Sequence, residues 1–287
     1  MRSRDTQSRR DFFKLAGVAG SALAVGSAFG RPCFAAEASS QAEKKATFAL
    51  GLASYTLRKF DLDQTLAMTK RVGLTHICLK SFHLPLDATA EQIAAAVAKV
   101  KQAGLDLYGG GVITMKTDQD VNQAFDYAKA AGMRTIVGAP LPDVLPLVNE
   151  KVKQFGIEVA IHNHGPGDKV YPTPESVYQK VEKFDKRIGL CIDVGHTLRI
   201  GADPVADVER FADRLLDLHI KDVSAAAPEG QTVEIGRGVI DIPALLRTLL
   251  KINYCRVASF EHEKDENDPL AGLAESVGYI RGVLSAI

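Results

Sequence analysis

The chain lacks tryptophan altogether and contains only four cysteines and four methionines among its 287 residues. The cysteines are scattered and form no C-x-x-C pair, so we expect no disulfide framework. Cys78, Cys191 and Cys255 each lie in a short apolar run, where a free cysteine behaves as a small hydrophobe. We therefore interpret these three as buried thiols and expect Cys33 to be removed with an N-terminal leader.

An excess of charge is missing as well, because 35 lysines and arginines balance 35 aspartates and glutamates. No overall field would attract nucleic acid or anionic lipid, so we expect no nucleic-acid partner. Hydrophobic residues make up 46% of the chain and charged residues 24%, which is the composition of an ordinary globular protein. A small, uncharged partner is therefore favoured.

The first 38 residues resemble a twin-arginine export signal. A charged segment with paired arginines, 8–14, is followed by an uncharged stretch, 15–30, and then by small residues around Ala36. An amphipathic helix or an uncleaved anchor is the alternative, but the uncharged stretch is shorter than the roughly 20 residues that a membrane span needs. We predict a signal peptide and cleavage region over 1–38, a polar linker over 39–46, and export of the folded protein to the periplasm or the extracellular space. No stable membrane anchor is expected after cleavage.

From residue 47 onward, short apolar runs alternate with longer helical patterns. This alternation requires a parallel sheet covered by helices, and eight repeats fit one closed (β/α)8 TIM barrel over 47–287. Gly73, Gly104, Gly132 and Gly156 each follow a helical pattern and precede a strand, as C-terminal helix caps do. The predicted strands are Phe48–Ala53, His76–Lys80, Leu105–Tyr108, Arg134–Gly138, Glu158–His162, Gly189–Asp193, Asp217–Lys221 and Arg256–Glu261.

Ligand-type side chains gather where the predicted strands end, and the active site of such a barrel lies at these ends. Five of the seven histidines lie there or just beyond, together with Asp193 and Glu261. A single histidine in a strand is more often structural than a ligand, but a core would have to desolvate this whole cluster without a charge partner. A bound cation would compensate that cost. Mixed carboxylate and imidazole donors suit Mn²⁺, Co²⁺, Fe²⁺ or Zn²⁺, and the share of oxygen donors leaves Mg²⁺ open.

Four motifs in a fixed order carry a resemblance to a known family. They are Ile192–His196, His219–Asp222, Gly236–Asp241 and Phe260–Glu263. In their order and spacing the chain after about Phe48 resembles the xylose-isomerase-like barrels of sugar phosphate isomerases and epimerases. That group also includes inosose dehydratases, dehydroshikimate dehydratases and a branch of apurinic endonucleases.

The resemblance implies a ligand set for one divalent metal ion. The family holds its metal with an acidic residue from strand five, an aspartate from strand six, a histidine from strand seven and a glutamate from strand eight. The last three correspond to Asp193, His219 and Glu261. Strand five departs from the family, because His162 stands where the glutamate is usual, and His164 follows on the same strand face. We expect His162 to be the fourth ligand, with His164 as the alternative.

A metal that polarises a substrate carbonyl needs a base that removes the neighbouring proton. The candidate bases are His162, His164, Asp168, Lys221 and Glu263. Strand three is expected to end at Tyr108, before a close-packed run of glycines over 109–111. For Lys80 and Lys221 an ion pair inside the barrel mouth is an equally good interpretation. The candidate contacts to substrate are Lys80, His83, Tyr108, Asp168 and His196.

Three functions are compatible with these residues. The first is a metal-dependent isomerase or epimerase of a sugar, and the second is a metal-dependent lyase or dehydratase of a keto sugar or 3-keto glycoside. The third is a non-catalytic periplasmic protein that binds sugar, because fold alone does not imply catalysis. An endonuclease is disfavoured by the neutral charge and by too few carboxylates for a multi-metal site. In each case the partner is a small sugar or keto sugar, and a homo-oligomer is left open.

Overall fold

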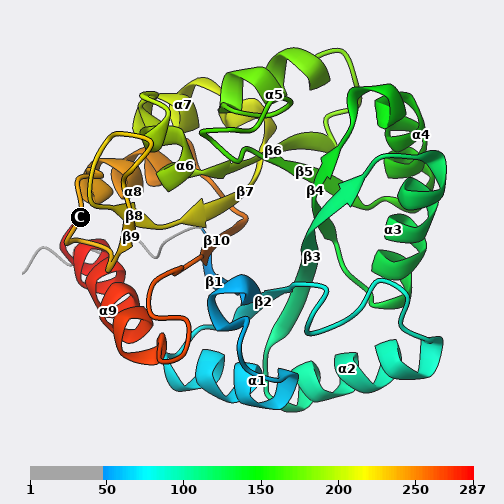
Figure 1. Ribbon diagram of the computed structural model, residues 1–287, viewed down its shortest axis with the longest axis horizontal. Helices are drawn as coiled ribbons and strands as arrows, with labels where there is room; N and C mark the ends of the chain where they lie inside the picture. Colours follow the sequence, from blue (N-terminus) through cyan, green and yellow to red (C-terminus); the bar gives the residue numbers. More distant parts are fainter. Residues whose placement is uncertain (1–47) are drawn as a thin grey trace, which may run out of the picture. The chain divides into compact units, whose positions relative to one another are not determined.

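The computed structural model of this chain describes residues 48–287, which form a closed barrel of eight parallel strands with helices around it (Figure 1). The order of the strands around the barrel is β1-β10-β7-β6-β5-β4-β3-β2. The predicted TIM barrel is thereby confirmed. The predicted signal peptide and linker lie outside the described residues and stay predictions. No helix among residues 48–287 is long and apolar enough to cross a membrane.

The observed elements match the predicted alternation of strands and helices. The barrel strands are β1 (Ala49–Ala53), β2 (His76–Leu79), β3 (Asp106–Met115), β4 (Thr135–Pro140), β5 (Glu158–His162), β6 (Ile188–Asp193), β7 (Leu215–Ile220) and β10 (Val257–Phe260). A small antiparallel pair, β8 (Asp222–Val223) and β9 (Thr232–Val233), follows β7. The α-helices are α1 (Leu62–Arg71), α2 (Ala90–Gln102), α3 (Asp118–Ala130), α4 (Leu145–Phe155), α5 (Pro174–Val181), α6 (Val194–Arg199), α7 (Pro204–Arg210), α8 (Ile242–Lys251) and α9 (Leu270–Ala286). Short 3-10 helices are η2 (Ser54–Leu57), η3 (Pro142–Val144) and η4 (Ala212–Arg214).

Local sequence explains where the helices begin and end. Helices α1, α2, α3 and α5 each start with a capping box, in which the cap side chain accepts from the third backbone N–H of the helix. The four glycines predicted to follow helices all have a positive φ, between 66° and 77°, which side-chain-bearing residues rarely adopt. They are Gly73, Gly104, Gly132 and Gly156. These signals set the helix boundaries and so place each strand end at the barrel mouth.

Strand β3 differs from the prediction. It does not end at Tyr108 but continues to Met115, so the glycines over 109–111 lie inside the strand. A Cβ on Gly109 would lie 2.8 Å from the Thr135 carbonyl oxygen, and one on Gly111 would lie 2.0 Å from the Val137 carbonyl oxygen. The glycines are therefore close-packed against β4, as predicted, but the weak strand preference of glycine made the strand look shorter than it is.

Two of the three predicted buried thiols are confirmed. Cys78 and Cys191 face the barrel interior with Tyr108, whereas Cys255 is exposed. The prediction for Cys255 is wrong because β10 begins only at Val257, so this residue lies in the preceding loop. A second, larger apolar layer fills the space between the outer faces of the strands and the helices. With its interior packed, the barrel leaves the ends of its strands as the place for chemistry.

Candidate metal centre at the barrel mouth

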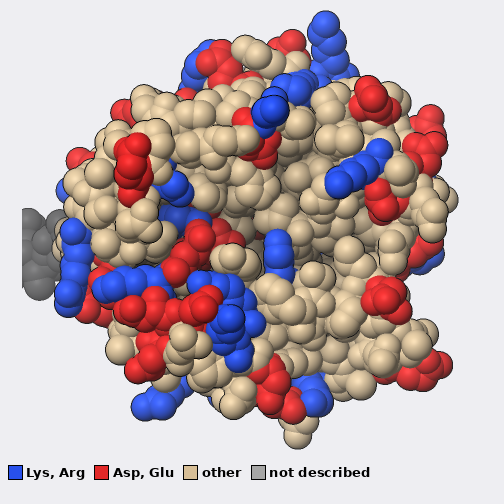
Figure 2. Space-filling model, viewed as in Figure 1, with Lys and Arg blue, Asp and Glu red and all other residues tan. Residues whose placement is uncertain are grey.

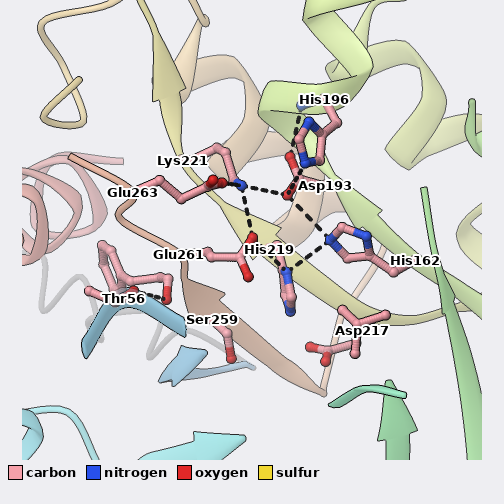
Figure 3. A network of polar contacts seen from close by, with 12 residues as sticks. Thr56, His162, Asp193, His196, Asp217, His219, Lys221, Ser259, Glu261 and Glu263 are labelled. Atoms are coloured by element: carbon pink, nitrogen blue, oxygen red, sulfur yellow. Dashed lines mark hydrogen bonds and ion pairs between the residues drawn. The ribbon is translucent and has the colours of Figure 1, made fainter. Parts of the chain in front are cut away.

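Four neighbouring strands bring the predicted metal ligands together (Figure 3). His162 is the last residue of β5, Asp193 is the last residue of β6, and His219 lies near the end of β7. Glu261 directly follows β10. All four side chains are buried, and each offers a donor atom within 4.8 Å of the others. The carboxyl ends of parallel strands thus collect two imidazoles and two carboxylates at one point.

The separations of the donor atoms fit a metal ion. His162 Nε2 lies 3.1 Å from His219 Nδ1 and 3.4 Å from Asp193 Oδ2, and His219 Nδ1 lies 3.2 Å from Glu261 Oε2. Ligands bound tetrahedrally at about 2.0–2.2 Å are about 3.3–3.6 Å from one another. Two nitrogen lone pairs that face each other this closely in a buried place need a proton or a cation between them. The donor set and its spacing therefore suit a divalent cation.

The protonation states of three of the four donors suit metal binding. His219 differs, because burial would lower its pKa but the neighbouring Glu261 carboxylate raises it above its ordinary value. Burial lowers the pKa of His162 to about 3, which leaves its imidazole neutral. Burial alone would raise the pKa of Asp193 and of Glu261, but neighbouring positive charges hold both below their ordinary values. Neutral imidazole and ionised carboxylate are the forms that bind metal.

Lys221 lies between carboxylates at the same strand ends and contacts three of them directly. Its Nζ is 2.9 Å from Asp193 Oδ2 and 2.8 Å from Glu261 Oε2, and it also contacts Glu263. Burial would lower the pKa of Lys221, but these three carboxylates raise it well above its ordinary value. The lysine therefore keeps its proton in this arrangement, and its role as a base stays a prediction. Its alternative interpretation, an ion pair in the barrel mouth, describes what the structure contains.

Two further histidines lie beside the four donors. The His164 ring is 4.5 Å from the His162 ring, and its Nδ1 pairs with Asp168 at 3.3 Å. The backbone N–H of His196 donates to Asp193 Oδ1 at 2.8 Å, and its ring Nε2 is 4.0 Å from Asp193 Oδ2. His162 rather than His164 therefore belongs to the donor cluster. His164, Asp168 and His196 are more exposed than the four donors, and the substrate contacts of Asp168 and His196 stay predictions.

The two predicted substrate contacts from strand two have different surroundings. Lys80 remains at the barrel mouth, where its Nζ donates to the Val112 carbonyl at 3.2 Å. Burial lowers the pKa of Lys80, and the charge of Glu261 opposes that shift across the mouth.

His83 is buried and engaged elsewhere. Its Nδ1 lies 2.9 Å from Ser54 Oγ, and its Nε2 lies 3.0 Å from Thr65 Oγ1. Both ring nitrogens therefore hold the loop after β1 against α1. These packing partners use the hydrogen-bonding capacity of both ring nitrogens, and a contact of His83 with substrate stays a prediction.

Tyr108 also differs from its prediction. Since β3 continues for seven residues beyond it, Tyr108 lies inside the barrel, below the strand ends. Its hydroxyl is 2.7 Å from Ser259 Oγ and donates to Asp217 Oδ2 at 3.1 Å. Burial raises the pKa of Asp217 to about 6. Tyr108 therefore satisfies a buried carboxyl group, and its contact with substrate stays a prediction.

We expect Tyr108→Phe to lower the free energy of unfolding by about 1–2 kcal/mol, because Asp217 loses a buried hydrogen-bond donor. Urea denaturation followed by circular dichroism measures this change. Metal affinity should stay within about twofold of the parent value, because Tyr108 does not contact the proposed ligands and substitutions at separate sites act nearly independently. A large loss of metal affinity without loss of stability would return Tyr108 to the active site.

Some residues that position the site carried no recognisable signal in the sequence. Asn163 Oδ1 accepts from the backbone N–H of Asp193 at 3.0 Å, and Thr197 Oγ1 donates to the Asp193 carbonyl at 2.7 Å. Thr56 Oγ1 accepts from the backbone N–H of His262 at 2.9 Å, which fixes the segment carrying Glu261. Asp217 had a usable signal, because strand alternation places it on the same face as His219.

The face of the molecule that bears the strand ends is hollowed near its centre (Figure 2). Acidic and basic side chains lie next to one another on this face and form no large area of a single sign. This arrangement offers no broad basic surface for a phosphate backbone and agrees with the balanced composition of the chain.

Comparison with known proteins adds the family context. The model of the family described as "Xylose isomerase-like TIM barrel" matches residues 53–283. A rhizopine catabolism protein, MocC, of Rhizobium meliloti is 32% identical over 133 residues, which cover 41% of this chain and 40% of that protein. An inosose dehydratase of Geobacillus kaustophilus is 28% identical over 129 residues, or 39% of this chain and 41% of the relative. The matched segment thus spans about two fifths of each relative.

Solved structures resemble the chain over most of its length. An L-ribulose 3-epimerase has a TM-score of 0.66 at 18% identity, covering 83% of this chain and 95% of that one. The IOLI protein with a bound zinc atom has a TM-score of 0.65 at 18% identity, covering 83% and 99%. At this identity the likeness establishes the fold.

Proposed function

The chain belongs to the xylose isomerase-like TIM barrel family, and we propose that it is a divalent-metal-dependent isomerase or epimerase of a sugar. The observation that carries this proposal is the convergence of His162, Asp193, His219 and Glu261 within 4.8 Å at the mouth of the barrel. An L-ribulose 3-epimerase with the same fold and a zinc-bound relative support the sugar and the metal, respectively.

These four residues would hold the metal. When bound, the ion would polarise a substrate carbonyl and stabilise the negative charge that develops as a neighbouring C–H proton leaves. The base must come from the chain itself. Glu263, which follows β10, is partly exposed and lies beside Lys221. His164, which follows β5, is partly exposed, and burial lowers its pKa, so its imidazole is neutral and able to accept a proton.

The positions of these two bases suit proton transfer at a substrate lying over the donor cluster. Strands β7 and β6 separate β10 from β5 in the barrel, so Glu263 and His164 approach the mouth from different strands. The ammonium of Lys221 donates to Glu263 and so orients its carboxylate. Lys80 and His196 supply donors for substrate hydroxyl groups at the same mouth. This arrangement allows one group to remove a proton and another to return it.

The second candidate function is a dehydratase or lyase of a keto sugar. His162 stands where the family has a glutamate, so a symmetric pair of glutamate bases is missing from this site. The inosose dehydratase of Geobacillus kaustophilus is among the relatives. Elimination begins with the same removal of a proton next to a carbonyl and needs no second base to return it to carbon.

Incubation in D₂O separates these functions. The protein, loaded in turn with Mn²⁺, Co²⁺, Zn²⁺ or Mg²⁺, is incubated with a panel of ketoses and 3-keto sugars and the products are read by NMR. An isomerase or epimerase incorporates deuterium next to the carbonyl with inversion or migration, whereas a lyase yields an unsaturated ketone. A protein that carries no stoichiometric metal and binds a sugar without turning it over would be a binding protein and would overturn the proposal.

A further inference from the structure

Lys221 and the proposed metal require the same two oxygen atoms (Figure 3). Lys221 Nζ lies 2.9 Å from Asp193 Oδ2 and 2.8 Å from Glu261 Oε2. Those same two oxygens face His162 Nε2 and His219 Nδ1, at 3.4 Å and 3.2 Å respectively. The ammonium therefore occupies the oxygen side of the four-donor cluster.

A divalent ion and this ammonium would compete for the two oxygens in a buried space. Lys221 is 2% exposed, Asp193 is 0% exposed, and two positive charges at contact distance repel strongly where water does not screen them. Binding of one cation therefore weakens the contact of the oxygens with the other. Conversely, the three carboxylates around Lys221 would repel one another in the metal-free chain if the ammonium were removed.

The structure provides a place for the ammonium to go. Glu263 already contacts Lys221 and is more exposed than the other two carboxylates, at 29% of its side chain against 0% and 9%. The stem of Lys221 packs on Gly195, where an added Cβ would lie 2.5 Å from the lysine Cγ. The stem is therefore held, while the end of the side chain can turn from Asp193 and Glu261 towards Glu263.

We propose that Lys221 is a resident cation that the metal displaces: it neutralises the site in the metal-free chain and withdraws to Glu263 when a divalent ion binds. This inference rests on the proposed metal site. It assigns Lys221 a positioning role, with two consequences that differ in sign. The lysine stabilises the metal-free protein, and it lowers the affinity for metal because the ion must displace it.

The test is a double-mutant cycle in Zn²⁺ affinity on the whole protein. Metal is first removed with a chelator, and Zn²⁺ affinity is then measured by competition with a second, chromophoric chelator. Lys221→Met should bind Zn²⁺ at least about tenfold more tightly, since the competing charge is gone. Glu263→Gln should bind Zn²⁺ at least about threefold more weakly than the parent, because the displaced ammonium loses its partner. In the Lys221→Met background, Glu263→Gln should change the affinity by less than about twofold, because its effect is transmitted through the lysine.

A second measurement uses the unmodified protein and does not depend on how the variants fold. Amine acylation followed by peptide mass spectrometry should label Lys221 faster with Zn²⁺ bound than without it. Lys251, on the surface in an ion pair with Glu209, serves as the internal control and should label equally in both states.

Thermal melts test the stabilising role of the lysine. Metal-free Lys221→Met should unfold at a lower temperature than the metal-free parent, and added Zn²⁺ should raise the midpoint of the variant by more than it raises that of the parent.

Different outcomes would overturn the displacement of Lys221 and the proposed metal site. Equal Zn²⁺ affinity in the parent and in Lys221→Met, with unchanged labelling of Lys221, would overturn the displacement while leaving the metal site in place. An equal effect of Glu263→Gln in both backgrounds would also overturn it, because the glutamate would then act by its charge alone. Absence of Zn²⁺ binding by the parent and by Lys221→Met would overturn the metal site itself.

Discussion

Replacing Asp193 by asparagine is expected to lower the affinity for divalent metal by more than about 100-fold, since loss of supporting partners alone costs metal sites about 10–100-fold. The asparagine keeps the shape of the side chain and can still accept from the backbone N–H of His196, as Asp193 does at 2.8 Å. It removes the charge that a cation requires and that the ammonium of Lys221 contacts at 2.9 Å. Elemental analysis of the purified variant and competition with a chelator measure the loss, and turnover should disappear with the metal.

The matched control is Asp213→Asn. Asp213 is a half-exposed carboxylate that pairs with Lys186 at 3.5 Å, far from the strand ends. Its replacement makes the same chemical change and should leave metal content and stability unaltered, because isolated surface pairs contribute little. If Asp193→Asn kept its metal at the level of this control, the four-residue centre would be the wrong site.

Arg214→Met is expected to lower the free energy of unfolding by about 3–5 kcal/mol, because it leaves several buried polar groups unpaired. Arg214 is 4% exposed, and its guanidinium donates to four backbone carbonyls. Those of Asp185 and Ile188 are each 2.9 Å away, and those of Glu182 and Phe184 are 2.8 and 2.9 Å away. These carbonyls lie where the chain passes from α5 into β6, the strand that ends in Asp193.

Arg210→Met provides the comparison for this loss of stability. Arg210 lies four residues away on α7, and its guanidinium pairs with Glu175 on the surface at 3.0 Å. Its replacement should cost less than about 1 kcal/mol. Urea denaturation of both variants at one pH measures the difference. Equal losses in the two variants would show that the four carbonyl contacts of Arg214 contribute no more than a surface ion pair.

Local patterns in the chain were enough to predict the barrel. Strand β5 was predicted with its observed bounds, Glu158–His162, because a short apolar run there is enclosed by a glycine cap and a polar loop. Gly156 supplies that cap in the left-handed conformation, a local requirement that a sequence displays directly. The predicted end of strand β3 was wrong because the glycines that follow Tyr108 have a tertiary role and not a local one. Its glycines are required by contact with β4, a feature with no local signature.

The candidate site shows the same division between local and tertiary information. Residue type and position at strand ends selected Asp193, His219 and Glu261, whose donor atoms the structure brings together. The same reasoning selected His83, although its ring is committed to Ser54 and Thr65. A histidine in a sequence does not show how its two nitrogens are used, because its partners come from distant segments.

The sequence by itself determined the alternation that makes the barrel, the helix ends, and the kinds of donor that stand at the strand ends. These follow from the period of apolar residues and from backbone conformations that are decided within a few residues. Only the tertiary structure decided which donors meet. Strand alternation predicted His162 and His164 on one strand face, but β5 ends at His162 and the chain then turns, which carries His164 to Asp168. Lys221 became a resident cation only when closure of the barrel placed Asp193 and Glu261 on either side of it.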